Sequence, residues 1–70
     1  MNGQMILYAF KSGDRYVRIG DGALHPVDMQ KASVYRSLDE IRALREGYPA
    51  LQQFSVVEMA IVEREIVVSG

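Results

Sequence analysis

The hydrophobic and polar positions of the first twenty residues predict a β-hairpin. Residues 5–10 are apolar at every position, and residues 15–19 alternate between polar and apolar side chains, which is the period of a strand. Gly13-Asp14 lies between the two runs, and glycine in the first central position favours a type II′ turn. This turn predicts three pairs of opposite residues: Ser12 with Arg15, Phe10 with Val17, and Tyr8 with Ile19.

A third strand follows after the turn signal Gly20-Asp21-Gly22. Residues 23–27 have the composition of a short strand, which Pro26 restricts to a sheet edge or a strand end. Asp28 then stands where it would cap a single helical turn over residues 29–31, and residues 32–35 are expected to be extended.

Residues 37–49 carry the clearest helix signal of the chain. Ser37 and Glu40 have the spacing of a capping box, in which each side chain satisfies a free backbone N–H group of the first turn. An apolar stripe at helical spacing follows, formed by Leu38, Ile41, Leu44 and Tyr48. We expect a helix of about ten residues that ends at Gly47 as its C′ residue. Arg45 lies close to the stripe, so its head either extends to water or meets a carboxylate across an interface.

The last part of the chain, residues 54–68, is rich in β-branched side chains and predicts a strand to about Val62, followed by a bend or a second short strand. The order of elements is therefore β-β-β-α-β. This order predicts an α+β fold with a three- to four-stranded, mainly antiparallel sheet and one helix packed on one face.

The first and last strands have apolar side chains on both faces, although the chain supplies one helix. A strand that is apolar on both sides normally belongs to a sheet covered on both sides. We therefore expect self-association, most simply as a dimer, through an uncovered sheet face whose residues are Met5, Leu7, Ala9, Val56 and Val62. The alternative is that residues 63–68 fold back as the missing cover, and residues 63–70 could also exchange between subunits.

Composition limits the class of protein. Seventy residues predict a single domain over residues 1–70, and the start at Met1 with its tight turns is typical of a complete small protein. The chain has no cysteine, which excludes disulfides and thiolate metal sites and agrees with a cytoplasmic location. The first apolar run is too short for a secretory leader or a membrane helix. A net charge of -1 gives no overall field that would recruit nucleic acid or an anionic membrane.

Catalytic and metal-binding patterns are weak. The single histidine, His25, needs an orienting partner to act as a general base, and the sequence reveals none. The carboxylates that one would examine lie in turns or on the last strand: Asp14, Asp21, Asp28, Glu58, Glu63 and Glu65. Each has a plainer role in a turn, a cap or a solvated strand face. We expect no enzyme, no metal site and no cofactor.

Two short segments interleave basic and aromatic side chains, and they give the candidate binding residues Tyr16, Arg18, Tyr35 and Arg36. Arginine binds phosphate with two parallel hydrogen bonds, and tyrosine offers a face for stacking. These residues indicate, as an alternative function, a module that contacts nucleic acid or a nucleotide. The plainer interpretation is that they are exposed hairpin residues whose stems cover apolar surface.

The stretch Lys31-Ala32-Ser33-Val34-Tyr35-Arg36-Ser37-Leu38-Asp39-Glu40, preceded by the strand Tyr16-Val17-Arg18, resembles a pattern in small phage- and prophage-encoded proteins of unassigned function. The resemblance covers about residues 15–62 and brings no functional residues with it. It implies a compact accessory protein in the host cytoplasm. Such a protein would inhibit a host defence factor by binding a host protein or by sequestering its nucleotide signal.

Overall fold

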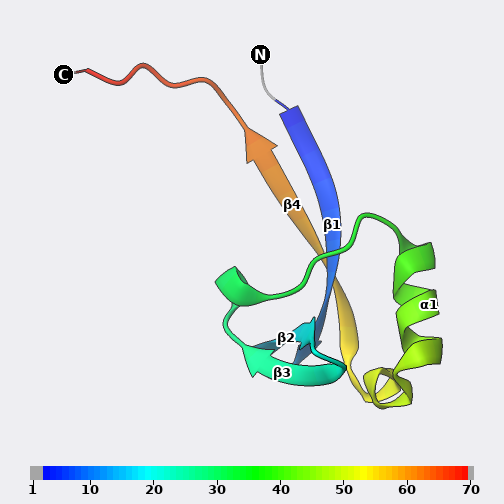
Figure 1. Ribbon diagram of the computed structural model, residues 1–70. Helices are drawn as coiled ribbons and strands as arrows, with labels where there is room; N and C mark the ends of the chain where they lie inside the picture. Colours follow the sequence, from blue (N-terminus) through cyan, green and yellow to red (C-terminus); the bar gives the residue numbers. More distant parts are fainter. Residues whose placement is uncertain (1–2, 70) are drawn as a thin grey trace.

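A computed structural model describes residues 3–69, so the start of the chain at Met1 lies outside the described residues. Within residues 3–69 the chain forms a small α+β fold with four strands and one α-helix (Figure 1). In chain order the elements are β1 (Gly3–Ser12), β2 (Arg15–Gly20), β3 (Ala23–Val27), η1 (Met29–Lys31), α1 (Leu38–Gly47), η2 (Pro49–Gln53) and β4 (Ser55–Glu63), where η denotes a 3-10 helix. The predicted order β-β-β-α-β is confirmed.

The strands form one antiparallel sheet in the order β3-β2-β1-β4. Gly13 has a φ of 60° and Asp14 is not among the residues with positive φ, which agrees with the predicted type II′ turn. Between β2 and β3, Asp21 and Gly22 both have positive φ, at 54° and 72°. That combination defines a type I′ turn, the other turn whose twist suits a tight hairpin.

The first hairpin follows the predicted register at its turn and departs from it further along. β1 and β2 pair at Ser12 with Arg15 and at Lys11 with Tyr16. The prediction that Tyr8 lies opposite Ile19 is wrong, because Tyr8 forms a β-bridge with Tyr35 instead. The Tyr8 N–H donates to the Tyr35 carbonyl at 2.7 Å, and the Tyr35 N–H donates to the Tyr8 carbonyl at 2.9 Å.

Ser33 explains why β2 separates from β1. Its N–H donates to the Val17 carbonyl at 3.0 Å, and its Oγ accepts a hydrogen bond from the Ile19 N–H at 3.0 Å. The segment before α1 therefore takes over backbone groups that a longer hairpin would have paired with one another. Every such group has to find a partner if it is buried, so this segment replaces the missing part of the hairpin ladder.

The start of α1 confirms the capping signal with one change of partner. Ser37 Oγ accepts from the Glu40 N–H at 3.2 Å, as a capping box requires. The Glu40 carboxylate accepts from the N–H of Arg36, at 3.1 Å, rather than from that of Ser37. At the other end Gly47 is the last helical residue rather than C′, and Pro49 begins η2 directly after Tyr48.

The core lies where α1 and η2 meet the sheet. Its buried members are Phe10, Val17, Ile41 and Leu51. Leu51 has no exposed surface, and Phe10 is also in edge-to-face contact with the ring of Tyr35, with centroids 6.1 Å apart. η2 thus contributes a central core residue although its sequence carries no strong pattern.

Arg45 packs against its own chain and does not extend to water as one of the two predictions required. Its guanidinium carbon lies 6.0 Å from the ring centroid of Phe10, and its Nη2 donates to the Phe54 carbonyl at 3.3 Å. Among the described residues its Nε is buried without a hydrogen-bond partner. The side chain is therefore held inside the chain, where it joins α1 to the residue that precedes β4.

Candidate protein-binding site at the strand ribbon

β1 and β4 pair along almost their whole length, from Gly3 opposite Glu63 to Lys11 opposite Ser55. β2 pairs with β1 only next to the turn that joins them. The half of the β1–β4 pair that lies far from this turn therefore projects as a two-stranded ribbon (Figure 1). The molecule is correspondingly elongated, with principal dimensions of 48 × 24 × 23 Å. We call residues 3–6 together with residues 60–63 the ribbon end.

The ribbon end exposes large apolar side chains on both faces. Met5 and Ile61 lie opposite each other and are 49% and 53% exposed. Val62 alternates with Ile61 along β4, so it faces the other side, and it is 64% exposed. Exposed apolar residues that occur singly are ordinary, but a cluster on one projection indicates a site of interaction.

The chain continues past the ribbon end as an irregular tail, residues 64–69, which is exposed throughout. Its three consecutive apolar residues, Ile66, Val67 and Val68, are 69%, 96% and 80% exposed. The expectation that residues 63–68 fold back over their own sheet is wrong in this structure. The tail leads away from the body of the molecule (Figure 1) and adds a second apolar segment next to the ribbon end.

The five interface residues predicted from the sequence fall into two groups. Met5 and Val62 are exposed at the ribbon end. Leu7 and Ala9 are buried at 8% and 0%. The fifth residue, Val56, packs against the core. The predicted interface did not include Ile61, which is 53% exposed. The alternating apolar residues of β4 could have indicated it.

The edges of the ribbon are open as well. β4 is an outer strand of the sheet, and within residues 3–69 its strand partner is β1 alone. Unpaired N–H and C=O groups along an outer strand form a template for a further strand. Backbone pairing then supplies affinity, and the side chains of the ribbon supply selectivity. This arrangement suits the binding of an extended polypeptide chain.

The four candidate phosphate-binding residues do not form one surface. Tyr16 and Arg18 occupy alternate positions of β2 and therefore share a face, and Lys11 Nζ lies 5.1 Å from the centroid of the Tyr16 ring. Tyr35 packs against Phe10 on the core side of the sheet. Arg36 is exposed at the start of α1. The structure thus separates the two segments that the sequence pattern had grouped.

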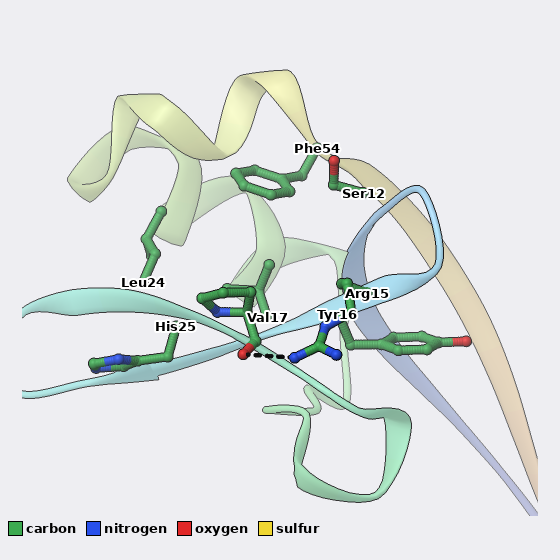
Figure 2. A pocket seen from close by; sticks show the side chains of 8 residues that line it. Ser12, Arg15, Tyr16, Val17, Leu24, His25 and Phe54 are labelled. Carbon is green, nitrogen blue, oxygen red and sulfur yellow. Dashed lines mark hydrogen bonds between the residues drawn. The ribbon is translucent and has the colours of Figure 1, made fainter.

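A cavity of about 300 Å³ opens beside the first hairpin (Figure 2). Its walls include Ser12, Arg15, Val17, Leu24, Pro26 and Phe54. The Arg15 guanidinium is held within the chain, with Nη1 3.4 Å from an Asp28 carboxylate oxygen and Nη2 donating to the Pro26 carbonyl at 3.5 Å. Arg15 therefore has a carboxylate neighbour of its own at this cavity, in an ion pair that is exposed to solvent.

His25 also lines this cavity, and its Nε2 lies 3.3 Å from the Gly20 carbonyl oxygen. Figure 2 shows the imidazole ring directed away from Arg15. In the described part of the chain no carboxylate orients this ring, as a general base would require. Nor do any three His, Asp or Glu side chains of residues 3–69 come together in a group that could hold a metal ion.

The comparisons add no relative to this description: no family model, no curated protein and no solved structure matches the chain. Neither α1 nor the short helical turns within residues 3–69 have the length and apolar character that crossing a bilayer requires. The candidate site therefore depends on the geometry of the ribbon end alone.

Proposed function

We propose that this chain is a non-catalytic binding protein that self-associates through the ribbon end. The observation that carries the proposal is the exposure of Met5, Ile61 and Val62 on a projecting ribbon whose outer strand is unpaired. A two-stranded ribbon by itself is marginally stable in water, and a further strand or cover stabilises it. A partner at this position would complete the sheet.

The free-energy gain from apolar contact between two copies is only slightly larger than the smallest cost of association, so this contact alone would give weak binding. Fully burying a side chain of this size contributes about 1.5–3 kcal/mol. The three residues are already about half buried, so each copy would gain roughly 1 kcal/mol per residue. Association itself costs at least about 4 kcal/mol in lost freedom of motion. Strong binding therefore requires backbone pairing along β4 in addition to the apolar contacts.

We further propose that the target of the associated protein is a host protein, in agreement with the resemblance to phage accessory proteins. Such a protein would act in the host cytoplasm and block a defence factor by occupying one of its surfaces. Apolar side chains exposed outside the ribbon end, Met29, Val34 and Leu38, support a protein target, because protein interfaces are apolar at their centres. Sequestering a nucleotide has weaker support, since Arg15 in the cavity is paired with Asp28.

Sedimentation velocity over micromolar concentrations tests self-association. The informative pair of variants is Ile61→Asp and Met29→Asp, because both side chains are 53% exposed and only Ile61 lies at the ribbon end. We expect the wild-type chain and Met29→Asp to associate equally and Ile61→Asp to remain monomeric. A wild-type chain that is monomeric at every concentration contradicts the proposal, and so does an equal effect of the two substitutions.

A further inference from the structure

We propose that the strand that completes the ribbon end is β4 of a second copy, paired antiparallel to the first with Ile61 on the two-fold axis. This inference rests on the proposed function and specifies its partner and register. The resulting sheet would run β3-β2-β1-β4 in one copy and β4-β1-β2-β3 in the other. Figure 1 shows that the second half of β4 lies away from α1, so a strand can approach its outer edge there.

Symmetry limits the possible registers. Residues directly opposite in an antiparallel sheet point to the same face, and faces alternate along each strand. A two-fold axis perpendicular to the sheet keeps each side chain on its face. The axis therefore lies between the two strands, midway between one residue and the same residue of the second copy, so that this residue is opposite itself. On the exposed half of β4, five residues could lie opposite their own copies in this way, and each defines one candidate axis: Met59, Ala60, Ile61, Val62 and Glu63.

Charge selects among these five positions. With the axis at Ile61, Glu58 of each copy lies opposite Arg64 of the other, so two opposite-charge pairs form. The axis at Glu63 places this carboxylate opposite its own copy, which is destabilising. The axes at Met59, Ala60 and Val62 leave Glu58 opposite an apolar residue: Ala60, Val62 and Ile66 respectively. In the described part of the chain, neither Glu58 nor Arg64 has an ion-pair partner of its own.

The same register gives the apolar residues suitable neighbours. Ile61 meets its own copy on the axis, and Ala60 lies opposite Val62 on the other face. The tail, which is exposed in the single chain, would extend β4 along the partner. Ile66 then lies opposite Val56, a residue that already packs against the core. The pairing therefore places an apolar neighbour beside Ile61, Val62 and Ile66 on their own faces of the sheet.

Disulfide trapping tests the register directly, because the native chain has no cysteine. Opposite residues on neighbouring strands have Cα atoms about 4.5–5.5 Å apart, within the range of roughly 4.4–6.8 Å that a disulfide spans. Glu63 shares the face of Ile61 and is also exposed, but in this register it is about 13 Å from its own copy along the strands, at ~3.3 Å per residue. Ile61→Cys should therefore form a covalent dimer under mild oxidation, and the control Glu63→Cys should not.

The outcomes separate this inference from the proposed function. If the wild-type chain associates in sedimentation but Ile61→Cys cross-links no faster than Glu63→Cys, the register is wrong and self-association stands. If the wild-type chain does not associate, both proposals fail. Preferential cross-linking of Ile61→Cys supports both.

Charge exchange provides a second test that needs no cysteine. Glu58→Arg and Arg64→Glu should each weaken the dimer by about tenfold, because each substitution sets like charges opposite each other at two symmetric positions. The double variant Glu58→Arg/Arg64→Glu should recover the wild-type dissociation constant to within about threefold. If the double variant dimerises as weakly as the single variants do, the proposed register is wrong.

Discussion

The two ends of β1 contain similar apolar residues and have opposite surroundings. Phe10 is 1% exposed, whereas Met5, five positions earlier on the same strand, is 49% exposed. Met5 lies on the face opposite α1, and on the helix face Val62 at the same end of the ribbon is 64% exposed. The helix reaches only part of the strand pair, because ten residues of strand extend about 33 Å and the ten residues of α1 extend about 15 Å. One short helix covers one half of the longest strand pair. The other half projects without a cover, and its apolar residues are available to a partner.

The largest expected effect belongs to the covered half. Phe10→Ala should lower the free energy of unfolding by about 3–5 kcal/mol, because it removes a fully buried ring from the core. A domain of this size has a stability of roughly 3–5 kcal/mol, so we expect the variant to be largely unfolded by circular dichroism. Met5→Ala on the same strand should retain the folded spectrum. Equal destabilisation by the two substitutions would contradict the contrast between the halves.

Removal of the tail should act on association and leave the covered half intact. A chain that ends after Arg64 keeps β4 and both partners of the charge pairs but loses Ile66 and its neighbours. We expect about tenfold weaker self-association, the effect of losing roughly 1.4 kcal/mol, with an unchanged thermal transition of the monomer. The measurement is sedimentation together with a melting curve below the dissociation constant. An unchanged dissociation constant would show that the tail takes no part.

Arg45 contributes to the packing of the half that α1 covers, since it lies over the Phe10 ring and donates a hydrogen bond to the Phe54 carbonyl. Arg45→Ala should lower the free energy of unfolding by about 1–2 kcal/mol through lost packing and one lost hydrogen bond. Arg42 on the same helix is the matched control, because its ion pair with Asp39 is exposed to solvent. Exposed pairs of this kind contribute little. Urea denaturation compares the two, and an equal loss would refute an interior role for Arg45.

The smallest expected effect concerns the start of α1. Ser37→Ala removes the oxygen that accepts from the Glu40 N–H and should cost about 1 kcal/mol in urea denaturation. Ser37→Thr should restore most of the loss, because threonine caps helices almost as well. Self-association at the distant ribbon end should not change in either variant. A cap variant that alters the dissociation constant would show that the two halves are coupled.

Local signals predicted most of the fold, and contacts distant in sequence account for what was missed. The turn at Gly13, the cap at Ser37 and the alternation in β4 each depend on a few adjacent residues. The bridge between Tyr8 and Tyr35 does not, and it is this bridge that replaces half of the predicted hairpin ladder. No local pattern indicates that an extended segment will displace a strand from its neighbour.

The candidate site was predicted in part for the same reason. The excess of apolar residues over available cover was visible in the sequence, and Met5 and Val62 are exposed as that reasoning requires. Which apolar residues stay uncovered depends on contacts between segments that are distant in sequence. Leu7 and Ala9 have the same pattern as Met5 and are nevertheless buried. The exposure of Ile66 likewise follows from the path of the tail, which local composition does not determine.

Amide hydrogen exchange of β4, followed by NMR at protein concentrations above and below the dissociation constant, tests the role of the ribbon end most directly. We predict that the outward-facing amides of residues 58–64 exchange more slowly at the higher concentration, while the amide of Phe10 exchanges at the same rate in both samples. Rates along β4 that do not depend on concentration would contradict the account.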